Sequence, residues 1–119
     1  MNDDFYIIIP SRIGSTRLKN KPLIDINGES LIQRVFKNAL NISPNTFVAT
    51  DSELIAKNLE IITSNVIMTA NEHISGTDRV HEAATKLNLN EQTLILNLQG
   101  DEPFIPNDLK SQMKNNFYS

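Results

Sequence analysis

The chain contains no cysteine, so it has no disulfide framework, no thiolate metal site and no cysteine nucleophile. It also lacks a basic excess. Its net charge of -3 argues against a general nucleic-acid binder, which carries positive charge over one face. No apolar run approaches the roughly 18 residues of a membrane span, and the acidic start is the reverse of a signal peptide's basic one. The composition therefore predicts a soluble, unexported protein, as suits the cytoplasm, with neither nucleic acid nor a membrane as partner.

The sequence has the ordinary composition of one small globular domain, with 119 residues of which 39% are hydrophobic and 21% charged. Short apolar or β-branched runs alternate with helical patterns. Strands are predicted at 6–9, 46–49, 65–68 and 93–98, and helices at about 30–41, after Asp51 and Ser52, from near 75–77, and more weakly from Asn107 onward. This alternation predicts an α/β fold with a Rossmann-like, mainly parallel sheet and helices on both faces.

An unusually long connection follows the first predicted strand, from Pro10 to Glu29. Within it, 23–26 followed by Asn27 and Gly28 predicts a small strand and a tight turn. The connection is rich in cations and small hydroxyl side chains, which together can cradle a polyphosphate: Arg12, Arg17, Lys19 and Lys21, with Ser11, Ser15, Thr16 and Gly14. The alternative is a solvated basic loop. The Walker and dinucleotide-binding glycine patterns are absent, which weighs against purine NTPases and NAD enzymes.

A carboxylate follows the last predicted strand, in the segment Asn-Leu-Gln-Gly-Asp-Glu-Pro at 97–103. Ligands of open α/β sheets bind at the carboxyl ends of the strands. Gly100 allows a sharp turn or a close backbone approach, and Asp101 is an oxygen ligand of the kind that Mg²⁺ takes singly. Magnesium-dependent phosphate chemistry is therefore one interpretation. An exposed turn of ordinary turn residues is the other.

Four sequence blocks, spread over nearly all of the chain, add a family resemblance. They are 9–18 with 21–23 and 27–28, then 48–51, 68–79, and 97–103. In order and spacing they resemble the opening of the CMP-KDO synthetases, the 3-deoxy-manno-octulosonate cytidylyltransferases. One difference is that Lys19 and Asn20 stand where the family usually has Pro-Gly, which leaves the geometry of this loop open.

The resemblance implies transfer of CMP from CTP to the acid sugar KDO, with release of pyrophosphate, for lipopolysaccharide synthesis. It implies three catalytic residues, of which Arg12 and Lys21 clamp the triphosphate and Asp101 holds Mg²⁺. The nucleotide-binding residues that it implies are Arg12, Ser15, Thr16, Arg17, Lys21, Ser75, Arg79 and Gln99. Family members are longer, so 1–119 is expected to be the amino-terminal, nucleotide-binding part. The remainder would carry sugar recognition, a second metal carboxylate and most of a homodimer contact.

Other functions stay open at this point. The sugar could be another acid sugar, such as an amino-KDO or a sialic-acid-like substrate, or the chain could be a noncatalytic nucleotide-binding module or a generic α/β interaction domain. His73 and His81 could serve a metal or act as a base, although a surface position is favoured for His81. Asp51 either lines the site or caps the next helix, and Asp78 with Arg79 forms either a surface pair or part of the site.

Overall fold

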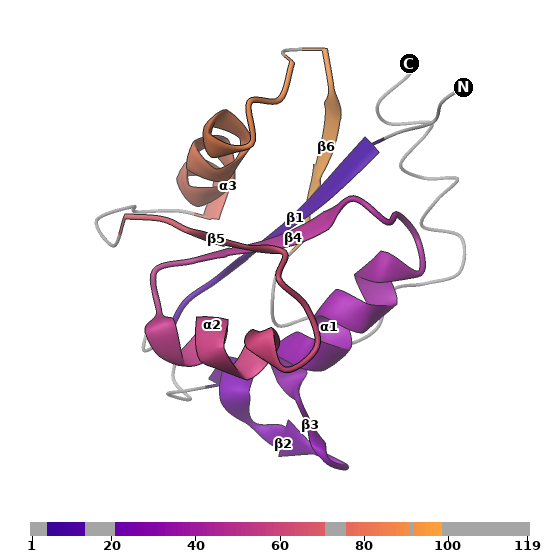
Figure 1. The fold of residues 1–119 in the computed structure, drawn as a ribbon, viewed down its shortest axis with the longest axis vertical. Helices are drawn as coiled ribbons and strands as arrows, with labels where there is room; N and C mark the ends of the chain where they lie inside the picture. Colours follow the sequence, from indigo (N-terminus) through magenta and orange to yellow (C-terminus); the bar gives the residue numbers. More distant parts are fainter. Residues whose placement is uncertain (1–4, 14–20, 71–75, 91, 99–119) are drawn as a thin grey trace.

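The computed structural model describes residues 5–13, 21–70, 76–90 and 92–98, and within them it forms a four-stranded parallel sheet (Figure 1). The strands lie in the order β5-β4-β1-β6. They are β1 (Phe5–Ser11), β4 (Thr46–Thr50), β5 (Val66–Met68) and β6 (Leu94–Asn97), and the helices between them are α1 (Leu31–Leu40), α2 (Glu53–Glu60) and α3 (Gly76–Lys86). The predicted α/β fold is confirmed, and the bounds of these four strands, the starts of the three helices and the end of α1 lie within two residues of their predicted positions. The helix predicted from Asn107 lies outside the described residues.

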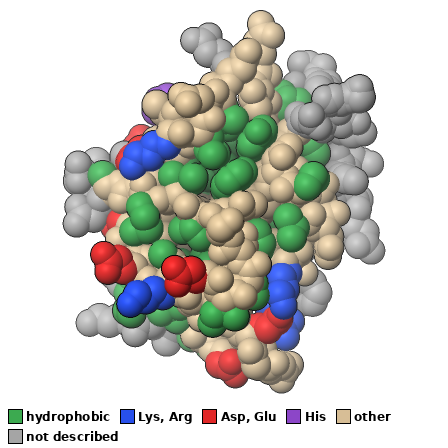
Figure 2. Space-filling model, viewed as in Figure 1, with side chains coloured by type: hydrophobic (Ala, Val, Ile, Leu, Met, Phe, Trp, Pro, Cys, Tyr) green, Lys and Arg blue, Asp and Glu red, His purple; other side chains and the backbone are tan. Residues whose placement is uncertain are grey.

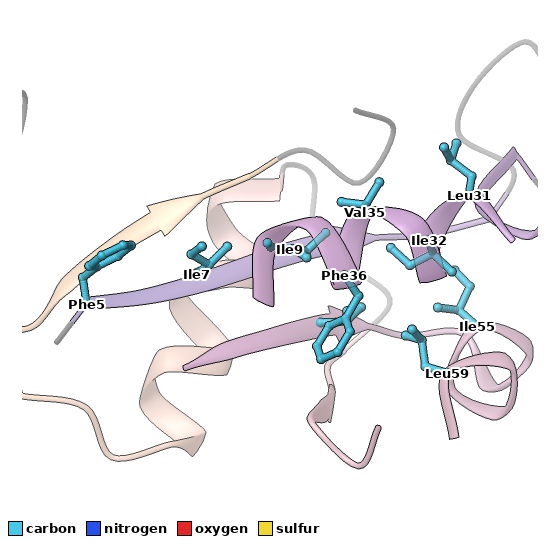
Figure 3. Close-up of a cluster of buried hydrophobic side chains, with 11 residues drawn as sticks. Phe5, Ile7, Ile9, Leu31, Ile32, Val35, Phe36, Ile55 and Leu59 are labelled. Atoms are coloured by element: carbon cyan, nitrogen blue, oxygen red, sulfur yellow. The ribbon is translucent and has the colours of Figure 1, made fainter. Parts of the chain in front are cut away.

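Helices cover both faces of the sheet because β1 sends hydrophobic side chains to each side. Phe5, Ile7 and Ile9 lie in the larger core cluster together with side chains of α1 and α2, and Figure 3 shows the three along β1. Ile8 points the other way and packs with Ala49 and with α3. A strand buried on both faces reads as a continuous apolar run, which is why 7–9 are all isoleucine.

The connection after β1 contains a short 3-10 helix, η1 (Lys21–Leu23), and a two-stranded antiparallel hairpin of β2 (Asp25–Ile26) and β3 (Glu29–Ser30). The tight turn at Asn27 and Gly28 is confirmed, since both residues have positive φ. The strand predicted over 23–26 is wrong in its first half. Leu23 belongs to η1, because Pro22 fixes a φ that suits a helical turn at this point. The Leu23 side chain packs against the larger core cluster.

Side-chain caps start the first two helices. Ser30 Oγ accepts a hydrogen bond from Gln33 N at 3.1 Å, and Gln33 Oε1 accepts one from Ser30 N at 3.0 Å, so α1 begins with a reciprocal capping box. In α2 the cap is Ser52, whose Oγ accepts from Ile55 N at 3.2 Å. The interpretation of Asp51 as the cap of α2 is therefore wrong. No helix in the described part of the chain is long and apolar enough to cross a membrane.

The contact between α1 and the sheet gives a stability prediction. Phe36 is only 1% exposed and lies in the larger core cluster, so Phe36→Ala is expected to lower the free energy of unfolding by about 3–5 kcal/mol. Leu54→Ala is the matched control, because Leu54 is 60% exposed on α2 and its loss creates no cavity. Urea unfolding followed by far-UV circular dichroism measures both changes. Equal decreases in the free energy of unfolding for the two variants would contradict the position of Phe36 in the core.

Candidate functional site

The four strands end at one edge of the sheet, here called the carboxyl edge, at Ser11, Thr50, Met68 and Asn97. The chain runs from β1 outward to β4 and β5 and then returns to the other side of β1 as β6. The strand order therefore reverses between β1 and β6. In open α/β sheets the ligand crevice lies outside the carboxyl ends of the strands at such a reversal.

Two of the proposed cationic residues are described, and one of them, Arg12, lies at this reversal. Arg12 directly follows β1 and its side chain is exposed, whereas Lys21 begins η1 and is half-buried. Ile24, the residue after η1, accepts a hydrogen bond at its backbone oxygen from Leu31 N, the first residue of α1, at 2.9 Å. Leu98 N donates to Ile8 O at 3.2 Å, so the chain leaves β6 beside β1. The topology thus places Arg12, which follows β1, and Leu98, which follows β6, on the two sides of the reversal.

Buried polar atoms mark both sides of the reversal. Ser11 is 6% exposed, and its Oγ has no hydrogen-bond partner. Asn97 Oδ1 is likewise buried and unpartnered, while Asn97 Nδ2 reaches Thr77 Oγ1 at 3.4 Å. Asn97 pairs with Ile8 in the sheet, and its side chain lies on the face that α3 covers. Ser11 lies two residues after Ile9 on β1, so its side chain is on the opposite face, with the larger core cluster. The two atoms therefore lie on opposite faces of the sheet.

Arg79 lies at the ends of β4 and β5 and is not on the surface, since it is only 2% exposed. Its Nη1 donates to Thr69 Oγ1 at 2.5 Å and to Ala70 O at 3.1 Å. Its Nη2 lies 3.7 Å from Asp51 Oδ2. The interpretation of Asp78 and Arg79 as a surface pair is therefore wrong, and Asp51 faces a buried cation. The burial of Arg79 was not visible in the sequence, because its partners follow two other elements, β4 and β5.

Two further side chains of α3 bind the same stretch of backbone. Glu82 Oε1 accepts a hydrogen bond from Ala70 N at 3.0 Å, and Lys86 Nζ donates to Met68 O at 2.7 Å. The two side chains also form an ion pair with each other at 2.9 Å. With Arg79 they make a stripe along one helix face at spacings of three and four, here called the α3 stripe. Sequence reasoning missed this stripe, although its helical spacing was a usable signal.

The other proposed site residues lie outside the described residues: Ser15, Thr16, Arg17, Ser75, Gln99 and Asp101. Within the described ranges no three His, Cys, Asp or Glu side chains gather as a metal site would need. His81 is exposed on α3, as predicted, and His73 also lies outside the described ranges.

A hollow of about 320 Å³ lies between the hairpin, α1 and α2. Its polar wall is already paired, since Ser30 Oγ donates to Asn58 Oδ1 at 2.5 Å and Gln33 Nε2 donates to Asn58 O at 2.8 Å. At its rim Glu29 accepts a hydrogen bond from Lys37, which holds the pKa of the Glu29 carboxyl below its usual value. The hollow is best explained as a packing seam between helices. Figure 2 shows charges of both signs interspersed over this side of the molecule.

Fold and carboxyl edge together define a Rossmann-like α/β protein with a strand-order reversal, the position at which open α/β sheets bind their ligands. The comparison with protein families gives the finer assignment. The model of the family described as "Cytidylyltransferase" matches residues 6–118. The chain belongs to the cytidylyltransferase family.

Curated relatives support the family assignment. The chain is 46% identical over 111 residues to a 3-deoxy-manno-octulosonate cytidylyltransferase of Lawsonia intracellularis, with 92% of the chain and 44% of the relative covered. It is 45% identical over 113 residues to the enzyme of the same name from Hahella chejuensis, with 94% and 44% covered. The chain therefore spans less than half the length of these curated relatives.

Solved structures agree with the fold. A CMP:2-keto-3-deoxy-manno-octonic acid synthetase complexed with CTP matches with a TM-score of 0.84 and 38% identity, over 98% of this chain and 49% of that one. A cytidylyltransferase from Leptospira borgpetersenii matches with a TM-score of 0.72 at 24% identity, over 97% and 49% of the two chains, and this likeness concerns the fold alone.

Proposed function

We propose that the chain is the CTP-binding part of a cytidylyltransferase that transfers CMP to KDO and releases pyrophosphate. The observation that carries the proposal is the reversal between β1 and β6, because it puts Arg12 where open α/β sheets bind their ligands, in a chain of this family. The named relatives and the CTP complex of the structural neighbour support the choice of nucleotide and sugar. In keeping with the resemblance, we further propose a cytoplasmic homodimer at full length that serves lipopolysaccharide synthesis.

The proposed step needs no nucleophile from the protein. The anomeric oxygen of the sugar forms a bond to the α-phosphorus of CTP, while the bond from that phosphorus to the bridging oxygen breaks. Pyrophosphate leaves with the bonding electrons, and the hydroxyl proton passes to solvent. Charge builds on phosphate oxygens during this step, so catalysis comes mainly from positioning and from preorganised cations. Arg12 and Lys21 are proposed to supply those charges.

The residue types that follow β6 in the sequence suit a magnesium ion. Asp101 follows Leu98 by three residues in the sequence, and Mg²⁺ usually takes one or two carboxylates together with phosphates and water. When bound, Mg²⁺ would neutralise charge on the phosphate oxygens. Asp101 is proposed to hold it. Ser15, Thr16, Arg17, Ser75 and Gln99 are proposed to line the nucleotide.

A noncatalytic nucleotide-binding module is the second candidate, because the chain spans only 44% of its relatives' length. Another acid sugar as substrate is a variant of the first candidate, since nothing in the described residues selects the sugar.

The test compares pyrophosphate release by two proteins, given CTP, Mg²⁺ and KDO. One is the 119-residue chain. The other, here called the extended chain, joins it to the carboxyl-terminal portion of the Lawsonia intracellularis relative. The extended chain is expected to release pyrophosphate only when KDO is present. The short chain is expected to bind CTP in calorimetry with no measurable release.

Each outcome assigns the function. KDO-dependent release of pyrophosphate supports the proposal. Release that depends on a different acid sugar would keep the cytidylyltransferase activity and change only the identity of the sugar substrate. Binding of CTP without release by a folded extended chain would favour the noncatalytic module. Absence of CTP binding by both proteins would contradict the proposal and favour a generic α/β interaction domain.

A further inference from the structure

Arg79 connects the ends of two strands through one buried guanidinium. Thr69 and Ala70 follow β5, Asp51 follows β4, and all three contact Arg79. A buried cation is costly unless charges and hydrogen bonds satisfy it, so removing a partner disturbs the whole group. Backbone pairing joins the same two strand ends, because Thr69 N donates to Thr50 O at 2.9 Å. The group therefore fixes this half of the carboxyl edge.

The guanidinium is suited to setting distances between these groups. It is a planar fork with donors in fixed directions, whereas the lysine ammonium is a point charge on a flexible stem. Nη1 of Arg79 is engaged by Thr69 and Ala70, and Nη2 faces Asp51. At 2% exposure the side chain offers almost no surface to a ligand.

We propose that Arg79 is a positioning residue, which holds the ends of β4 and β5 in the arrangement that receives the nucleotide and does not itself contact CTP. The inference rests on the proposed function for its ligand. It differs from the role that the family resemblance implies, in which Arg79 binds the nucleotide directly. Glu82 and Lys86 of the α3 stripe assist by binding the backbone of Ala70 and Met68.

The sign of the effect of Asp51→Asn on CTP affinity separates the two roles. Asp51 is an anion at the edge where an anionic triphosphate is proposed to bind. If Arg79 and Asp51 acted on CTP through charge alone, removing the Asp51 charge would tighten binding. If Arg79 instead positions the strand ends, the same change removes the carboxylate that faces the buried guanidinium of Arg79 and disturbs the strand ends. Asp51→Asn is then expected to weaken CTP binding by about fivefold, in the same direction as Arg79→Gln.

Two further variants test the geometry. Arg79→Lys keeps the charge but loses the fork, so we expect it to weaken CTP binding nearly as much as Arg79→Gln. A direct charge contact predicts substantial rescue by lysine. The double variant Asp51→Asn/Arg79→Gln is expected to bind CTP no more weakly than Arg79→Gln alone, because both changes break one group. Lys57→Gln, an exposed cation on α2, is the matched control and is expected to bind like the unsubstituted chain.

The experiment is calorimetry with CTP and Mg²⁺ on the 119-residue chain, together with amide hydrogen exchange. Exchange at Thr69 and Ala70 is expected to speed up about tenfold or more in Arg79→Gln and Asp51→Asn, with Ala39 in α1 unchanged. Tighter CTP binding by Asp51→Asn, rescue by Arg79→Lys, or unchanged exchange at both amides would overturn the inference. If the unsubstituted chain fails to bind CTP, the proposed function fails, and the exchange result alone decides whether Arg79 fixes the strand ends.

Discussion

Asp101→Asn in the extended chain is expected to lower kcat for pyrophosphate release by about 100-fold or more. The substitution keeps the size of the side chain but removes the charge that is proposed to hold Mg²⁺. A bound metal contributes several kcal/mol to stabilising charge on phosphate oxygens, and each 1.36 kcal/mol is tenfold in rate.

Glu60→Gln is the matched control for this prediction, because Glu60 is an exposed carboxylate at the last residue of α2. It is expected to leave kcat within about twofold. The measurement is a coupled pyrophosphate assay over a series of Mg²⁺ concentrations. The Asp101→Asn variant should also need more Mg²⁺ for half-maximal rate. Equal rates for the two variants at all Mg²⁺ concentrations would show that Asp101 does not hold the metal.

Elements whose signals are local could be predicted from the sequence. The three adjacent isoleucines of β1 are buried on both faces, so the strand is marked by residue type alone. For α1, the apolar spacing and Ser30 locate the helix, and Gln33 completes the cap three residues later. Alternation of such elements was enough for the parallel sheet, because only right-handed crossovers connect parallel strands well.

Features that depend on tertiary contacts could not be predicted. Arg79 was expected either to pair with Asp78 on the surface or to bind the nucleotide, and its burial was not foreseen, since its partners Thr69 and Asp51 come from the ends of different strands. Leu23 looked like part of a strand, and the core contact that goes with η1 was invisible. For the candidate site, sequence reasoning located Arg12 at a strand end, which the structure confirms, while most of its other proposed residues lie outside the described ranges.

Arg12→Ala in the extended chain is expected to lower kcat/KM for CTP by about 100- to 1,000-fold. Arg12 follows β1 at the strand-order reversal and its side chain is exposed, so it is placed to meet a phosphate in the crevice. The loss expected is that of one preorganised donor to developing charge. Initial rates of pyrophosphate release over a range of CTP concentrations give kcat and KM separately.

Two variants make the Arg12 result specific. Arg12→Lys keeps a positive charge but loses the fork that binds two phosphate oxygens, so its kcat/KM is expected to fall between those of the unsubstituted protein and Arg12→Ala. Lys57→Ala removes an exposed cation from α2 and is expected to change kcat/KM by less than about twofold. A bidentate phosphate contact predicts that the loss in kcat/KM increases in the order Lys57→Ala, Arg12→Lys, Arg12→Ala. Similar small losses in all three would instead assign Arg12 to the general positive field of a solvated loop, and the triphosphate would then have to be held by other cations.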